Sequence, residues 1–129
     1  MKRVLLMIAG LAIPVFATAG VVDELQAEYR TAGAAAPSAE QGRRLWNETY
    51  VVDGERRSCT TCHDADLRKT GRHAATGKPI EPLAPSVNPV RLTDRGEVTK
   101  WLARNCKWTL GRVCTPEERG HLLEFIRTQ

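Results

Sequence analysis

Five consecutive residues, Cys59-Thr60-Thr61-Cys62-His63, constrain this chain more than any other feature of its sequence. The pattern C-x-x-C-H places two thiols and an imidazole within about one turn of backbone. Three kinds of site use cysteines at this spacing: a thioredoxin-type redox pair, half of a zinc site, and the covalent attachment of a haem. The rest of the sequence has to decide between them.

The surroundings of the motif favour haem attachment. A redox pair is expected at a strand-to-helix junction of a βαβ unit, and zinc needs a second ligand pair, for which Cys106 and Cys114 have an unusual separation of eight. In haem attachment both thiols add across the vinyl groups, and the adjacent imidazole binds the iron. The sequence therefore predicts one covalent haem c, held by Cys59 and Cys62, with His63 as the proximal ligand.

The N-terminus has the organisation of a secretory signal peptide. A charged start is followed by an apolar run over residues 4–16, which is too short to span a bilayer, and by the small residues Ala17-Thr18-Ala19. We expect residues 1–19 to be a signal peptide cleaved after Ala19, and residues 20–129 to be a single periplasmic domain without stable membrane insertion. The alternative is a membrane anchor that stays attached.

Removal of the signal leaves a weakly positive chain. Without Lys2 and Arg3, the 19 basic residues fall to 17 against 15 acidic ones, and no basic block or aromatic series indicates nucleic-acid binding. Such a surface is typical of a solvated domain, although it can favour an acidic protein partner. In an oxidising compartment, Cys106 and Cys114 are left to pair with each other if the other two cysteines hold haem.

Four helices are predicted, over residues 22–32, 38–49, 94–105 and 115–126. Their signals are apolar side chains at helical spacing and N-terminal caps at Ser38, Asp94 and Thr115. The segment between the second and third helices is rich in glycine and proline and is expected to be mostly loop. So long a loop is unusual in a small domain unless it wraps a large apolar group. Since no segment has strand periodicity, the sequence predicts an all-α domain.

The second axial ligand of the iron is not methionine, since Met1 and Met7 both lie in the signal. The remaining candidates are His73, His121, a lysine, Asn88, Asn105 and an open site. His121 is expected to face water, because it points away from the apolar stripe of its helix, and His73 is expected to be a solvated loop residue.

Asn105 follows Val98, Trp101 and Leu102 on one predicted helical face, so its amide is expected to be buried. A buried amide needs a partner, which is either the iron or a carbonyl group. The pattern of residues alone favours the carbonyl.

Several further segments resemble a known family. They are Ala84-Pro85-Ser86-Val87-Asn88-Pro89, Arg91-Leu92-Thr93-Asp94 and Lys100-Trp101-Leu102-Ala103-Arg104-Asn105-Cys106, followed by Cys114. From about Gly42 to Phe125, the chain resembles the sphaeroides haem proteins, which are small class I-type cytochromes c. The resemblance implies a class I cytochrome c-like fold, with about four helices around one covalent haem.

The resemblance also implies a function. The family places an asparagine, here Asn105, on the ferric iron, and a disulfide joins Cys106 to Cys114. Reduction releases the asparagine, so that the ferrous haem binds O2, NO, CO or a similar small ligand, and the electron partner is a dihaem cytochrome c or another redox protein. Some relatives have histidine at the ligand position.

We therefore expect a periplasmic single-electron carrier with a redox-gated sixth haem site. The alternatives are a plain electron shuttle with a permanently closed site, a haem oxidoreductase or sensor for oxygen or nitrogen oxides, and a haem-free disulfide protein. Enzyme activity is the less favoured of these, because no catalytic acid or base stands in a recognisable motif. Trp46, Trp101 and Trp108 are expected to be pocket walls.

Overall fold

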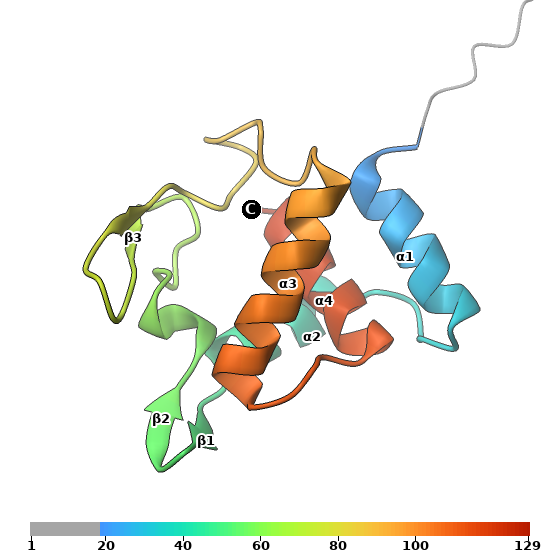
Figure 1. Ribbon diagram of the computed structural model, residues 1–129. Coiled ribbons are helices and arrows are strands. Elements are labelled where there is room, and N and C mark those ends of the chain that lie inside the picture. Colours follow the sequence, from blue (N-terminus) through green and yellow to red (C-terminus); the bar gives the residue numbers. More distant parts are fainter. Residues whose placement is uncertain (1–18) are drawn as a thin grey trace, which may run out of the picture.

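Four helices and two short hairpins make up residues 19–129, which are the residues that the computed structural model describes (Figure 1). In chain order they are α1 (Val21–Thr31), α2 (Ala39–Asn47), β1 (Tyr50–Val52), β2 (Glu55–Arg57), a 3-10 turn (Cys59–Thr61), β3 (Gly71–Arg72), β4 (Pro79–Ile80), α3 (Arg95–Leu110) and α4 (Pro116–Arg127). The predicted signal peptide falls on residues 1–18, outside this range, apart from Ala19. None of the helices described has the length and apolarity needed to cross a bilayer.

The predicted helix starts are confirmed by their caps. In each case the side chain of the N-cap residue accepts a hydrogen bond from the backbone N–H three residues later, as expected for polar caps. The pairs are Ser38 with Gln41 at 3.2 Å, Asp94 with Glu97 at 2.8 Å and Thr115 with Glu118 at 3.2 Å. These local interactions fix where three of the four helices begin.

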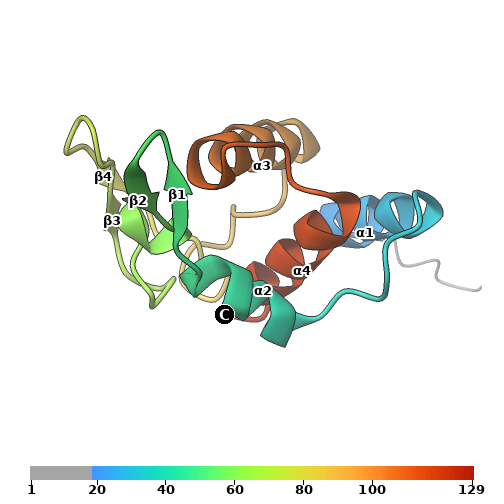
Figure 2. The same ribbon diagram turned by 90° about the horizontal axis from the view of Figure 1, so that it is seen from below.

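The crossing of α2 over α4 is the most extensive contact between elements (Figure 2). Gly42 lies at the crossing, where a Cβ atom would stand only 2.0 Å from the carbonyl oxygen of His121. One turn further along α2, the buried indole of Trp46 packs against the ring of Phe125, with centroids 5.9 Å apart. A glycine at the crossing thus allows α2 to bring its tryptophan into the core.

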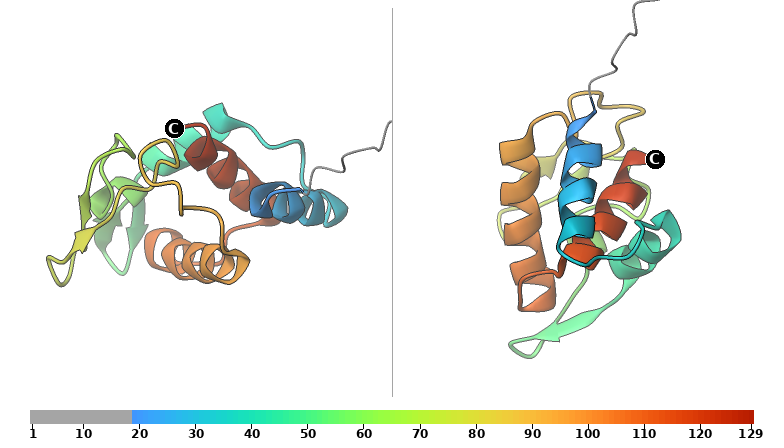
Figure 3. Two further views of the ribbon diagram at one scale, coloured as in Figure 1. Left: turned by 90° about the horizontal axis from the view of Figure 1, so that it is seen from above. Right: turned by 90° about the vertical axis from the view of Figure 1, so that its right-hand side faces the viewer.

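On the opposite side, α1 packs along α4 and next to α3, as the right-hand view of Figure 3 shows. Its buried residues Val22, Leu25 and Tyr29 form a second apolar cluster with Val98 of α3 and Leu123 of α4. The two hairpins lie at the other end of the molecule from α1 (Figures 1 and 2). Helix α4 is therefore covered from two sides.

The β1–β2 hairpin was not expected from the sequence. Its strands pair antiparallel from Tyr50 with Arg57 to Val52 with Glu55. Asp53 and Gly54 form the turn with φ values of 53° and 79°, the left-handed conformation that two-residue hairpin loops require at both positions. Strands of three residues are too short to show periodicity, but the Asp-Gly pair was a usable signal.

The prediction that His121 faces water is wrong. Only 7% of the residue is exposed, and its Nδ1 accepts a hydrogen bond from the backbone N–H of Ser38 at 2.9 Å. The helical projection assumed that α4 buries one stripe of residues. Because α1 and α2 cover two different sides of α4, the buried surface extends to His121 as well.

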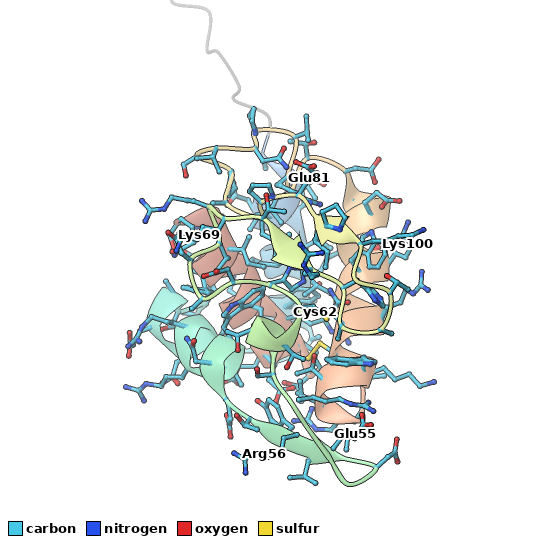
Figure 4. All side chains as sticks on the ribbon, turned by 90° about the vertical axis from the view of Figure 1, so that its left-hand side faces the viewer. Glu55, Arg56, Cys62, Lys69, Glu81 and Lys100 are labelled. Atoms are coloured by element: carbon cyan, nitrogen blue, oxygen red, sulfur yellow. A yellow bond between two sulfur atoms is a disulfide. The ribbon has the colours of Figure 1, made fainter. Side chains whose placement is uncertain are left out.

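A disulfide joins Cys106 in the last turns of α3 to Cys114 just before α4, as predicted; it is the yellow bond beside α3 in Figure 4. Both residues are buried, and their Cα atoms are 5.5 Å apart. Closing so short a loop stabilises the folded chain by about 2 to 3 kcal/mol in chain-entropy models. The bridge fixes the end of α3 to the start of α4.

Candidate functional site

The C-x-x-C-H segment forms one tight turn directly after β2. The backbone N–H groups of Cys62 and His63 both donate to the carbonyl oxygen of Cys59, at 3.4 and 3.0 Å. Ser58 caps this turn, and its backbone N–H donates to the hydroxyl of Thr61 at 2.9 Å. Figure 4, which views this side of the molecule, shows Cys62 between α2 and α3.

Cys59 and Cys62 are partly buried and are not disulfide-bonded. Burial raises the pKa of the Cys59 thiol to about 12, so the sulfur is uncharged at neutral pH. The side chain of Thr109 from α3 lies within hydrogen-bonding reach of this sulfur. An environment that disfavours a thiolate is compatible with a thioether, which carries no charge.

His63 is held as a neutral imidazole. Burial, together with the positive charge of Arg91, lowers its pKa to about 4, so at neutral pH the ring is in the form that binds metal ions. The indole of Trp46 packs against the imidazole, with ring centroids 5.4 Å apart and planes tilted by 40°. The core tryptophan of α2 therefore supports the predicted proximal ligand.

Asn105 precedes Thr109 by one helical turn of α3, and Thr109 lies beside Cys59. Thr109 was not predicted as a site residue, although its i+4 spacing from Asn105 places both residues near one face of the helix.

The expected burial of Asn105 is wrong. Asn105 is exposed and Trp101 is 46% exposed, whereas the buried residues of α3 are Val98, Cys106 and Thr109. The α3 helix turns this narrower stripe to the protein core. Asn105 is on its flank, beside the stripe.

The two histidines and Asn88, which were also considered as axial ligands, have structural hydrogen bonds. In an exposed turn, Nδ1 of His73 accepts from the backbone N–H groups of the two residues Ala75 and Thr76, both at 3.2 Å. The Asn88 amide donates to the carbonyl oxygen of Pro82 at 3.0 Å. The Nδ1 atom of His121 is occupied by Ser38. These hydrogen bonds give the three side chains structural roles in the described part of the chain.

Within residues 19–129, two buried side-chain nitrogens lack a hydrogen-bond partner, Nε1 of Trp46 and Nε of Arg57. Trp46 packs on His63, and Arg57 is two residues before Cys59, so both flank the attachment segment. Unpaired buried donors are rare, and these two leave hydrogen bonds available to a bound group. Together with the uncharged thiol and the neutral imidazole, they fit a covalent haem.

A C-x-x-C-H turn held between two crossed helices and a facing third helix defines a c-type cytochrome of class I-like fold. The structure described as oxidised SHP, an oxygen-binding cytochrome c, has a TM-score of 0.77 and 45% identity, covering 84% of this chain and 96% of that one. The cytochrome c-type protein SHP of Cereibacter sphaeroides is 44% identical over 130 residues, with 100% of each chain covered. This chain belongs to the SHP family.

Two further comparisons agree with this assignment. The crystal structure of oxidised cytochrome c'' from Methylophilus methylotrophus has a TM-score of 0.74 and 28% identity, covering 84% of this chain and 94% of that one. A family model described as a domain of unknown function, DUF1924, matches residues 32–126. The class I-like helical fold is thus confirmed, and membership of a cytochrome c family implies a covalent haem c. Ligation by Asn105 stays a prediction.

Proposed function

We propose that this chain is a periplasmic monohaem cytochrome that transfers single electrons and opens its sixth haem site on reduction. The signal peptide would be residues 1–19 and the haem domain residues 20–129. The proposal is supported by full-length similarity to SHP, a relative whose structure is described as that of an oxygen-binding cytochrome c. The electron partner is expected to be a dihaem cytochrome c or another redox protein.

The haem iron would supply the one-electron chemistry and the binding site for O2, NO or CO. The chain's own residues have separate tasks around it. Cys59 and Cys62 would attach the group, and His63, neutral and supported by Trp46, would bind its iron. The tight turn after β2 holds these three side chains next to one another.

Asn105 is the residue on which the gated site depends. A neutral amide oxygen is a hard and weak ligand, so it binds ferric iron better than the softer ferrous iron. Asn105 would therefore bind the oxidised iron and leave it when an electron arrives. The observation that carries this assignment is the position of Asn105, one helical turn from Thr109 at the Cys59 sulfur.

Absorption spectra of the haem-loaded protein test this assignment. The wild type is expected to be low-spin when oxidised, high-spin when reduced, and to bind carbon monoxide only when reduced. Asn105→Ala should make the oxidised protein high-spin. Asn105→His should keep the oxidised protein low-spin, because imidazole also binds iron.

Asn88→Ala is the matched control, since it removes the same amide group from a residue bonded to Pro82 instead. It should leave both spin states unchanged. If Asn105→Ala stays low-spin when oxidised, Asn105 is not the ligand. If the reduced wild type is low-spin and ignores carbon monoxide, the protein is a plain electron shuttle with a closed site.

A further inference from the structure

A surface groove runs between the β1–β2 hairpin and the C-terminal half of α3. Its main lining residues are Val52, Asp53, Arg57, Arg104, Lys107 and Trp108. The hairpin and α3 are in contact, and Figure 1 shows both beside the turn that follows β2. The groove belongs to neither of the two apolar clusters of the core.

The lining of the groove is cationic around an aromatic centre. Arg57 is paired with Glu55 at 2.8 Å, which leaves Arg104 and Lys107 beside one lining carboxylate, that of Asp53. The guanidinium of Arg57 stacks on the ring of Trp108 at 4.8 Å from its centroid, and the indole remains 37% exposed. Tryptophan and arginine are the residues enriched at the energetic centres of protein interfaces.

The groove also lies next to the point of haem attachment. Arg57 precedes Cys59 by two residues, and Trp108 precedes Thr109, whose side chain reaches the Cys59 sulfur. Electron exchange between proteins requires a short path between their redox groups. A partner bound in this groove would therefore be close to Cys59, where the haem is expected to be attached.

We propose that this groove docks an acidic surface of the redox partner. This proposal rests on the electron-transfer function proposed above. Opposite charges steer the encounter and raise the association rate at low ionic strength. A second copy of this chain is a poorer occupant of the groove, because two such grooves would repel each other.

The test measures electron transfer from reduced flavodoxin, an acidic protein donor, to the oxidised haem-loaded protein by stopped flow. Lys107→Glu is compared with Arg30→Glu, since both replace an exposed basic residue in the last turn of a helix with the same change in charge. At low ionic strength, Lys107→Glu should slow the reaction roughly fivefold and Arg30→Glu less than twofold. Added salt should slow the wild type and narrow this difference.

Reduced riboflavin, a small neutral donor, separates failure of the surface from failure of the function. It should reduce all three proteins at the same rate, because it needs no charged docking site. If electron transfer from flavodoxin is slowed equally in both variants, the assignment of the groove is overturned. It is also overturned if sedimentation shows that the wild type is a dimer and that Lys107→Glu dissociates it. If riboflavin cannot reduce the wild type, electron transfer itself is refuted.

Discussion

Replacing Gly42 by alanine tests the helix crossing that positions the haem-binding turn. The new Cβ atom would be 2.0 Å from the carbonyl oxygen of His121 and 2.6 Å from Cβ of Phe125. To restore ordinary contact, α2 must move away from the α4 backbone by roughly 1.4 Å, and neither contact belongs to the flexible end of a side chain. Overpacking of this kind should lower the free energy of unfolding by about 3 kcal/mol.

Gly120→Ala is the matched control on the facing helix. Its Cβ atom would meet Tyr29 at 3.8 Å and Pro37 at 3.9 Å, which are ordinary contacts. Alanine is the better helix former, so this variant should be more stable than the wild type by about 0.5 to 1 kcal/mol.

Guanidinium unfolding of the haem-loaded, disulfide-bonded proteins, followed by far-UV circular dichroism, measures both changes. A loss of stability below about 1 kcal/mol in Gly42→Ala would refute the argument from close approach. Because Trp46 of α2 supports His63, the same variant should also alter the absorption spectrum of the haem.

Two other side chains give measurable predictions. His121→Leu leaves the partly buried Ser38 N–H without its acceptor and should cost about 1 to 3 kcal/mol, whereas the exposed His73→Leu should change stability by less than about 0.5 kcal/mol in the same unfolding assay. Equal costs would contradict the role of His121 as a buried acceptor. The hydrogen bond from Arg112 holds the pKa of Glu118 below its usual 4.5, so the stability that the carboxylate adds is present above pH 4.5 and is lost as pH falls through the lowered pKa. The stability difference between wild type and Glu118→Gln, measured from pH 6 to pH 3, should shrink below pH 4.5, and a constant difference would argue against this linkage.

Most of the helical framework could be predicted from short-range signals. The caps at Ser38, Asp94 and Thr115 each depend on a side chain and a backbone N–H three residues later. The hairpin was missed because its strands are too short for periodicity, although its Asp53-Gly54 turn is just as local. The residues that form these hydrogen bonds are neighbours along the chain, so the bonds can be predicted without knowledge of any tertiary contact.

The chemistry of the candidate site was equally local. C-x-x-C-H carries its spacing within five residues, and once Cys59 and Cys62 are assigned, only Cys106 and Cys114 are left to form a disulfide. The role of Asn105 as an iron ligand was implied by the resemblance to a known family and stays a prediction. Its expected burial, taken from a helical projection, was wrong.

The sequence by itself thus determined where three of the helices begin and which cysteines pair, and it predicted which residues attach the haem, because each depends on neighbours along the chain or on simple counting. Only the tertiary structure decided that His121 is buried, that Gly42 must lack a side chain, and that Thr109 meets Cys59. A helical projection can rank the faces of one helix, but it contains no information on how many neighbours will cover them.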